Sequence, residues 1–306
     1  MVRHLTRLAL AASVLAPAVI AADSAGPVTV RLDEVEWHTS LASAPVLPER
    51  PLRLVVNDPA RRAWSFKPER GLVRSAGPRT WTWQAPATPG PVEATLEPAD
   101  GDEINLNLLV MVPASHVGRD GRLNGYRIGA YPSKPLRGNP LYLPPEGFIE
   151  VTERTADTRL SPRFTLGQFV SKQAQDGPRY VVIEPELVVR LEQLADRLEA
   201  QEKPEHLHVM SGYRTPFYNR AIGNVEYSLH QWGAAADVFV DADRDGRMDD
   251  LDENGRIDKQ DARTLFRIAD LLGGRRPFEG GLGVYGGTAA HGPFLHIDVR
   301  DTVARW

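Results

Sequence analysis

Three polar residues have types and spacings that suit a metal site. The stretch SLHQWGAAADVFVD (228–241) contains His230 and Asp237, and FLHIDVR (294–300) adds His296 on a strand-like run. Imidazole and carboxylate groups bind zinc, and a catalytic zinc site has three protein ligands and one position left for water. A single histidine more often has a structural role, and the same donors also suit other transition metals. We expect these three residues to form a zinc site.

Small residues separate the first two of these candidate ligands. Gly233 is followed by three alanines at 234–236. Without bulky side chains, this backbone can pass close to neighbouring structure. The pattern predicts close packing that holds His230 and Asp237 at a fixed separation.

Three motifs follow one another in the second half of the chain: SGYRTPFYN (211–219), SLHQWGAAAD (228–237) and FLHIDVR (294–300). Together they resemble the D-alanyl-D-alanine metallopeptidase family of cell-wall enzymes, which shares its zinc fold with lysostaphin-type peptidases and the hedgehog signalling domain. The resemblance covers residues 160–306, and the ending HIDVRDTVARW is most similar to the murein endopeptidase branch. It implies a secreted zinc peptidase that cleaves cross-links or stem peptides of bacterial peptidoglycan.

The resemblance also implies roles for other residues. Its ligands match the three candidates above, and Arg214 matches an arginine that faces the scissile carbonyl. A fixed guanidinium can stabilise negative charge that develops on that oxygen; a surface turn residue is the alternative. Tyr213 is expected in the pocket wall. Ser228 is expected beside the substrate, with a capping hydroxyl as its alternative role.

The proton-transfer residue departs from the family pattern. Pro293 and Phe294 occupy the positions where family members usually carry a glutamate or a histidine before the last ligand. We therefore expect His291 to act as the general base, because an imidazole can take and return a proton near neutral pH. Asp298 shares a strand face with His296 and is expected to orient that ligand.

A second chemical signature, DADRDGRMDDLDENGRIDKQD (241–261), follows the metal strand. Calcium loops of the EF-hand type supply ligands from positions 1, 3, 5, 7, 9 and 12, with glycine at position 6. Two overlapping frames fit this pattern, with Gly246 and Gly255 at position 6. The layout resembles the calcium repeats of thrombospondin and dockerin modules, and a solvated acidic loop is the alternative. The expected calcium ligands are Asp241, Asp243, Asp245, Arg247 (through its carbonyl), Asp249, Asp250, Asp252, Asn254, Arg256 (through its carbonyl), Asp258 and Asp261.

The start of the chain predicts export. Residues 1–22 have a basic region, a short apolar run and small residues, the order found in a signal peptide. We expect a secreted or periplasmic protein with no stable membrane span after cleavage; an uncleaved anchor is the alternative. The chain has no cysteine, so disulfides cannot stabilise it. A net charge of −4 without a basic run gives no footprint for nucleic acid.

The distribution of elements predicts two folded parts. Short alternating runs over 27–115 favour an all-β sandwich of the immunoglobulin type, with Trp81 and Trp83 on its core face or, alternatively, in a ligand-binding strip. Residues 116–160 form a Pro/Gly-rich connector. Residues 161–306 are expected to form an α+β zinc peptidase domain with a central antiparallel sheet and a calcium-binding insertion at 241–261.

Two other functions are compatible with these patterns. A catalytically inactive cell-wall binding module with zinc and calcium would account for the missing family base. An adhesion or scaffold protein would make the calcium loops primary. The sequence favours no oligomeric state, and it does not distinguish D,D from L,D bonds or endopeptidase from carboxypeptidase action.

Overall fold

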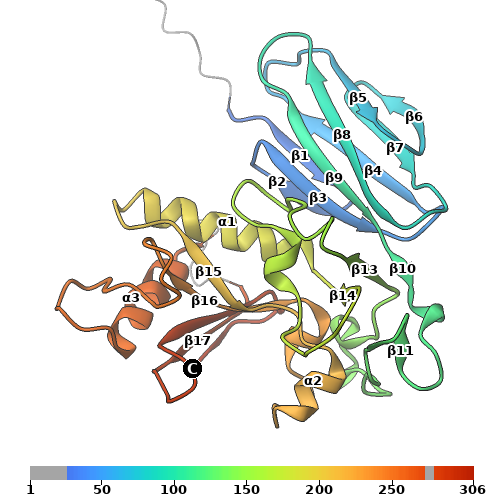
Figure 1. Ribbon diagram of the computed structural model, residues 1–306. Helices are drawn as coiled ribbons and strands as arrows, with labels where there is room; N and C mark the ends of the chain where they lie inside the picture. Colours follow the sequence, from blue (N-terminus) through green and yellow to red (C-terminus); the bar gives the residue numbers. More distant parts are fainter. Residues whose placement is uncertain (1–25, 273–278) are drawn as a thin grey trace, which may run out of the picture.

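The N-terminal part of the protein consists of two stacked β-sheets (Figure 1). A computed structural model describes residues 26–272 and 279–306. The first sheet has the order β2-β1-β4-β7-β6 and the second β3-β9-β8-β5. Strands β3 and β9 pair in parallel, and the other described pairs in these sheets are antiparallel. The strands are β1 (Thr29–Leu32), β2 (Val35–Trp37), β3 (Leu41–Val46), β4 (Pro51–Asn57), β5 (Trp64–Pro68), β6 (Leu72–Gly77), β7 (Thr80–Gln84), β8 (Gly90–Pro98) and β9 (Ile104–Val110).

Tryptophans of β7 help to fill the space between these sheets. Alternation along the strand buries Trp81 and Trp83 on one face, as predicted for a core face. The rings of Trp81 and of Phe66 in the opposite sheet lie 6.0 Å apart. The indole N–H of Trp83 donates to the Arg70 carbonyl at 2.8 Å, which satisfies its buried polar atom. The core-face interpretation is confirmed, and the immunoglobulin-type topology stays a prediction.

A network of hydrogen bonds around the buried carboxylate of Asp58 stabilises this part and makes its stability sensitive to acid. The Asp58 carboxylate accepts hydrogen bonds from the Arg62 guanidinium, the Trp64 indole and the backbone N–H groups of Ala60 and Arg62. The bond from Arg62 is the largest cause that lowers the pKa of Asp58 from 3.8 to about 2.

We expect Asp58→Asn to lower the free energy of unfolding at pH 7 by about 2 kcal/mol, the scale of a charged hydrogen bond. Because the pKa of Asp58 is lower in the folded chain, the stabilisation is complete above about pH 4 and is lost as the pH falls toward about 2. Urea unfolding of parent and variant across this range measures the difference. If the free energies of unfolding of parent and variant differed by the same amount down to pH 2, the ionised Asp58 carboxylate would not be the source of the stabilisation.

The segment between the two parts is ordered by buried aromatic and aliphatic anchors. Figure 1 shows β10 leading from the stacked sheets into this segment. Tyr126, Ile128, Tyr142 and Phe148 are buried, so this connector packs against the folded parts. It contains β10 (Val112–Pro113), η1 (Ala114–His116), β11 (Arg122–Leu123), β12 (Tyr126–Arg127), η2 (Leu136–Gly138), η3 (Pro140–Tyr142) and β13 (Gly147–Val151). Strands β10, β13 and β14 (Arg179–Val181) form one small sheet, and β11 and β12 form a hairpin.

The C-terminal part has a five-stranded sheet of order β15-β16-β18-β17-β19. Its pairs are antiparallel except β17 with β19, which agrees with the expected central antiparallel sheet. Helix α3 packs against β17 and β18, and α1 contacts α3. In α1, Leu187, Leu191, Leu194 and Leu198 recur at helical spacing and are fully buried. The elements are η4 (Leu166–Phe169), α1 (Pro185–Glu199), β15 (Leu207–Ser211), α2 (Pro216–Ala221), η5 (Leu229–Trp232), β16 (Ala235–Val240), α3 (Lys259–Ala269), β17 (Gly281–Tyr285), β18 (Phe294–Asp298) and β19 (Ala304–Arg305).

The signal peptide predicted at 1–22 lies outside the described residues. Within the ranges that are described, no helix combines the length and the apolar character needed to cross a membrane.

Candidate metal centre

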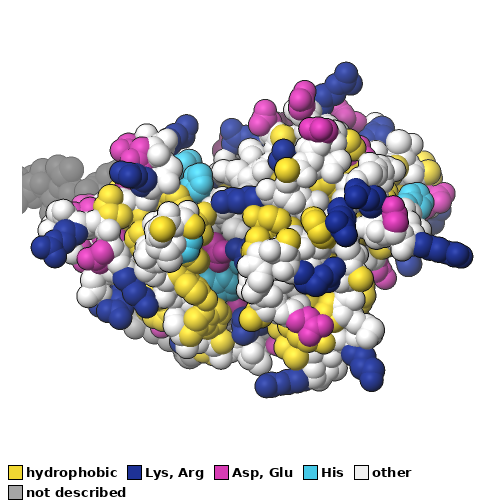
Figure 2. All heavy atoms as spheres, turned by 60° about the horizontal axis from the view of Figure 1, so that its bottom comes forward, with side chains coloured by type: hydrophobic (Ala, Val, Ile, Leu, Met, Phe, Trp, Pro, Cys, Tyr) yellow, Lys and Arg dark blue, Asp and Glu magenta, His cyan; other side chains and the backbone are white. Residues whose placement is uncertain are grey.

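Two adjacent strands and one short helix bring the three candidate ligands together. Asp237 of β16 and His296 of β18 are directly opposite each other in the antiparallel register. His230 comes from η5, just before β16. The three residues are 2%, 4% and 9% exposed for His230, Asp237 and His296. On the face drawn in Figure 2, histidine and acidic side chains gather in a hollow between two bulges of the surface.

Gly233 lets η5 turn directly into β16. Its φ of 66° is left-handed, and a Cβ there would lie 2.1 Å from the carbonyl oxygen of Val182. The Gly233 carbonyl accepts a hydrogen bond from the N–H of Glu184 at 3.1 Å. Ala234, Ala235 and Ala236 are fully buried behind it. The close packing predicted from the small residues is therefore confirmed.

The hydrogen bonds of the two histidines fix which ring nitrogen faces the centre. His230 Nδ1 lies 2.7 Å from the Gly212 carbonyl oxygen, an acceptor only, so Nδ1–H donates. His296 Nε2 lies 3.2 Å from Asp298 Oδ2, and its N–H donates to that carboxylate. When both rings are neutral, the other nitrogen of each carries a lone pair toward Asp237.

These lone pairs converge at distances that fit a metal ion. His230 Nε2 and His296 Nδ1 are 3.3 Å apart, and they lie 3.2 and 2.9 Å from Asp237 Oδ1. Tetrahedral ligands at about 2.0–2.1 Å from zinc lie about 3.3 Å from one another. Three acceptors at these distances repel unless a cation joins them, so the donor set fits zinc or a similar transition metal.

The electrostatics of the centre also favour a positive charge. Burial lowers the pKa of the His296 imidazole, yet its hydrogen bonds to Asp237 and Asp298 raise it overall to about 9. Burial opposes ionisation of Asp237, but the two imidazoles hold its pKa well below the usual value. Burial lowers the pKa of His230. A divalent cation would replace the proton that the carboxylates otherwise attract.

Asp298 contacts His296 as predicted for an orienting carboxylate. It is fully buried and also accepts hydrogen bonds from the Gly281 N–H at 2.8 Å and from the Arg300 guanidinium. A Cβ on Gly281 would lie 2.2 Å from Asp298 Oδ2, so this glycine gives the carboxylate its space. These contacts hold the pKa of Asp298 below its usual value, against the effect of burial.

We expect Asp298→Asn to weaken zinc binding by about 10–100-fold, the usual effect of losing a partner that orients a ligand. Competition against a chromophoric chelator measures the affinity. Asp301→Asn, the same chemical change at an exposed position nearby, serves as the matched control. Equal affinities for the two variants would remove Asp298 from this role.

Arg214 lies beside the centre and is held on both sides. Its Nη2 donates to Asp237 Oδ2, and its Nε donates to Ser211 Oγ at 2.9 Å. The Arg214 N–H also bonds the carbonyl of His230 at 3.0 Å. These contacts fix the guanidinium beside Asp237, and its predicted contact with a substrate carbonyl stays a prediction.

Tyr213 requires a correction. It was expected to form a pocket wall, but it is only 1% exposed. Its hydroxyl lies 3.0 Å from that of Tyr131, which donates to the Gln231 carbonyl at 2.9 Å. Tyr213 thus supports η5 from inside the protein, because the chain before it turns inward with Gly212 packed against Phe169. Ser228 precedes η5, is buried, and its substrate contact stays a prediction.

His291 is not joined to the centre by any hydrogen bond or ion pair among the described residues. It precedes β18, its Nδ1 lies 2.8 Å from the Gly292 carbonyl, and its ring contacts Phe294 edge-on. It lines a groove of about 550 Å³ together with Phe239 and Met248. Its role as the general base stays a prediction.

The acidic insertion brings two groups of carboxylates together. Asp241, Asp243 and Asp245 form one group, and Asp250, Asp252 and Asp261 form the other. Asp252, common to both predicted frames, thus lies with the second group. Other predicted ligands make hydrogen bonds to the backbone. The Asp249 carboxylate accepts the N–H of Ala242, the Asn254 side chain accepts the N–H of Arg256, and Asp258 caps α3.

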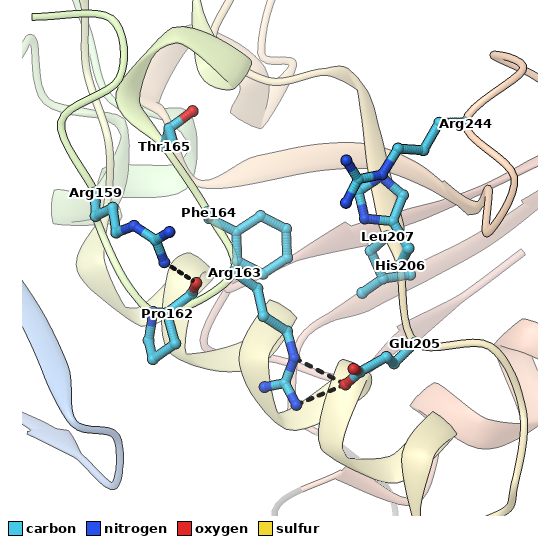
Figure 3. Close-up of a pocket in the computed structure, with 9 residues that line it drawn as sticks. All are labelled: Arg159, Pro162, Arg163, Phe164, Thr165, Glu205, His206, Leu207 and Arg244. Atoms are coloured by element: carbon cyan, nitrogen blue, oxygen red, sulfur yellow. Dashed lines mark hydrogen bonds and ion pairs between the residues drawn. The ribbon is translucent and has the colours of Figure 1, made fainter.

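A separate pocket of about 370 Å³ does not include the metal centre (Figure 3). Arg163 reaches across it to Glu205 and also pairs with Glu192, Asp196 and Glu199. This network joins the segment before η4 to α1 and, through Glu205, to the segment that precedes β15. We assign it a structural role.

The geometry above agrees with one comparison to known proteins. Residues 162–264 match the family model for peptidase M15. The match covers about a third of the chain and supports the M15 metallopeptidase family for this segment. It includes Arg214, His230 and Asp237 and ends before His296. No significant match was found among curated proteins or solved structures.

The sequence did not reveal several groups that position the centre. The Gly212 carbonyl orients His230, and Arg300 with the Gly281 N–H orients Asp298. Trp306 lies against His296, with ring centroids 5.4 Å apart. Among these groups, only Trp306 could have been suspected from the sequence, because it lies in the ending HIDVRDTVARW that carries the family resemblance.

Proposed function

We propose that the protein is a secreted zinc metallopeptidase that hydrolyses peptide bonds of bacterial peptidoglycan. The observation that carries the proposal is the buried convergence of two imidazole nitrogens and one carboxylate oxygen within 3.3 Å. The peptidase M15 match over residues 162–264, which include His230 and Asp237, supports peptide hydrolysis. The cell-wall motifs in the sequence supply the substrate class, and the signal-like residues 1–22 support export.

The residues around the centre divide the chemical tasks. A zinc ion held there would provide Lewis-acid activation of a peptide carbonyl and of water. The Gly212 carbonyl and the Asp298 carboxylate orient the imidazoles of His230 and His296. Arg214 is the donor we assign to the negative charge that develops on the substrate carbonyl oxygen.

His291 is our candidate for proton transfer. It lines the groove of about 550 Å³ together with Phe239, a residue of β16 two positions beyond Asp237. In our proposal a stem or cross-link peptide extends from this groove toward the centre, with its scissile amide between His291 and the candidate ligands. The imidazole would then take a proton from water and give it to the leaving amine.

A non-catalytic wall-binding module is the second candidate. Pro293 and Phe294 are buried and apolar at the positions where the family usually carries its base. Such a protein would keep the zinc site for structure and bind peptidoglycan without cleaving it.

The experiment incubates the purified zinc-loaded protein with cell-wall sacculi and identifies the released muropeptides by mass spectrometry. His230→Ala removes one metal-facing nitrogen, and His38→Ala removes an exposed histidine from the N-terminal part as the matched control. Circular dichroism confirms that each variant is folded.

Cleaved stems or cross-links with parent and His38→Ala, but not with His230→Ala, would support the peptidase and identify its bond. Intact muropeptides with a folded, zinc-loaded parent would overturn it. Co-sedimentation with sacculi in that case would favour the wall-binding module.

A further inference from the structure

One carboxylate of the acidic insertion has a buried oxygen without a hydrogen-bond partner. Asp241 follows β16 directly and is 1% exposed. Its Oδ2 accepts the N–H of Gly246 at 3.1 Å, and its backbone N–H donates to the His206 carbonyl at 2.9 Å. Its Oδ1 is buried, with no partner among the described residues. A buried carboxylate oxygen is costly unless a donor or a cation contacts it.

Two more carboxylates converge on Asp241. Asp241, Asp243 and Asp245 each present one oxygen, and these oxygens all lie within 4.8 Å of one another. Three negative groups at this separation repel one another. The group contains carboxylates and no imidazole, so it suits a hard cation that prefers oxygen ligands.

The backbone holds these carboxylates in place. Asp245 Oδ1 accepts the N–H of Arg247 at 2.8 Å, and Gly246 has a left-handed φ of 82°. Met248 is buried and anchors the loop in the core. Arg247 occupies position 7 of the frame, where loops of this type supply a backbone carbonyl oxygen. Calcium accepts six to eight oxygens in irregular geometry, whereas magnesium requires a near-octahedral set, so this loop favours calcium.

The two arginines of the loop line neighbouring pockets: Arg244 lines one and Arg247 another. Figure 3 shows Arg244 extending from the loop toward His206, with which it lines the neighbouring pocket. His208 Nδ1 lies 3.6 Å from Asp241 Oδ2, and burial lowers the pKa of His208 despite that carboxylate. The charge of the three carboxylates thus calls for an external cation.

We propose that the loop 241–249 binds a calcium ion through Asp241, Asp243 and Asp245, and that the ion fixes the end of β16. The loop returns to that strand, because the Asp249 N–H donates to the Val240 carbonyl and Asp249 Oδ2 accepts the N–H of Ala242, both at 2.9 Å. Strand β16 also carries Asp237. The inference goes beyond the proposed function, because it holds whether or not the protein is a peptidase.

The second group of carboxylates provides an internal comparison. In Asp261, Oδ1 accepts the N–H groups of Leu251 and Asp252, and Oδ2 accepts the N–H of Asp258. Its buried oxygens are therefore satisfied by the protein itself. We do not extend the proposal to this group.

The test measures calcium binding to the full chain. Calcium is removed on a chelating resin, one equivalent of zinc is restored, and CaCl₂ or MgCl₂ is titrated by calorimetry. Thermal unfolding with and without CaCl₂ gives a second measurement. The variants are Asp241→Asn and Asp243→Asn; Asp243 is exposed, so its substitution does not threaten the fold. Glu253→Gln removes one charge from the same insertion outside both groups and is the matched control.

We expect calcium at a hundred times its Kd to raise the Tm of the parent by roughly 5 °C or more. Affinity should fall at least about tenfold in Asp241→Asn and Asp243→Asn and stay unchanged in Glu253→Gln. Calcium should also slow hydrogen exchange at the end of β16 in the parent, but not in Asp243→Asn.

Three results would overturn the proposal. The first is a parent that shows neither heat nor a Tm change with calcium. The second is a response that survives both variants and is lost in Asp252→Asn, which would assign the ion to the second group. The third is calcium binding without slower exchange in β16, which would remove the link to the strand.

Discussion

Replacing His230 by alanine is expected to remove tight zinc binding while the chain stays folded. His230 Nε2 lies 3.3 Å from His296 Nδ1 and 3.2 Å from Asp237 Oδ1, so the variant loses one of three convergent donors. Removing a residue that only orients a ligand usually lowers metal affinity by about 10–100-fold. Removing a ligand itself should therefore lower the zinc affinity by more than about a hundredfold. If the protein is the proposed peptidase, hydrolysis should fall at least as far, because a zinc ion held at the centre would supply the activation of carbonyl and water.

Zinc content after desalting, measured by plasma mass spectrometry, checks this result, and chelator competition gives the affinity. His38→Ala should retain one equivalent of zinc. If His230→Ala also retained one equivalent with unchanged affinity, the three-residue centre would be wrong.

Gly233→Ala is expected to destabilise the protein by about 3 kcal/mol or more. The left-handed backbone costs alanine about 1–2 kcal/mol. In addition, the new Cβ would lie 2.1 Å from the Val182 carbonyl oxygen, and overpacking of this kind costs about 1–3 kcal/mol. The strain falls between His230 and Asp237, so zinc affinity should fall as well.

Gly223→Ala separates the two causes. Gly223 has a similar φ of 69°, but a Cβ there would meet no atom within 4 Å. We expect the free energy of unfolding of this variant, measured with urea, to be about 1–2 kcal/mol lower than that of the parent, and its zinc affinity to be unchanged. Equal losses in the two variants would mean that the contact with Val182 contributes nothing.

The sequence predicted the three residues that converge in the candidate metal centre but not the geometry that joins them. The small residues at 233–236 and the motif order indicated His230, Asp237 and His296. Their meeting depends on the pairing of β16 with β18, across 59 residues of chain, and no local pattern specifies that register. The parallel pairs β3–β9 and β17–β19 were missed for the same reason.

Residues on loops were the least predictable. Tyr213 lies in a motif beside the centre, yet packing of Gly212 against Phe169 turns its side chain inward. His230 bonds a backbone carbonyl and Asp298 bonds a backbone N–H. Every residue has a backbone carbonyl, and every residue except proline has a backbone N–H, so the residue type does not reveal such partners. Strands with clear alternation, such as β7, were predicted correctly because burial follows period two directly.

The most direct test of the metal centre is a crystal structure of the zinc-loaded protein with anomalous data at the zinc edge. We predict one strong anomalous peak about 2.0–2.2 Å from His230 Nε2, Asp237 Oδ1 and His296 Nδ1, with Asp298 still bound to His296 Nε2. An anomalous peak elsewhere would contradict the account if these three atoms then made hydrogen bonds to one another and bound no zinc.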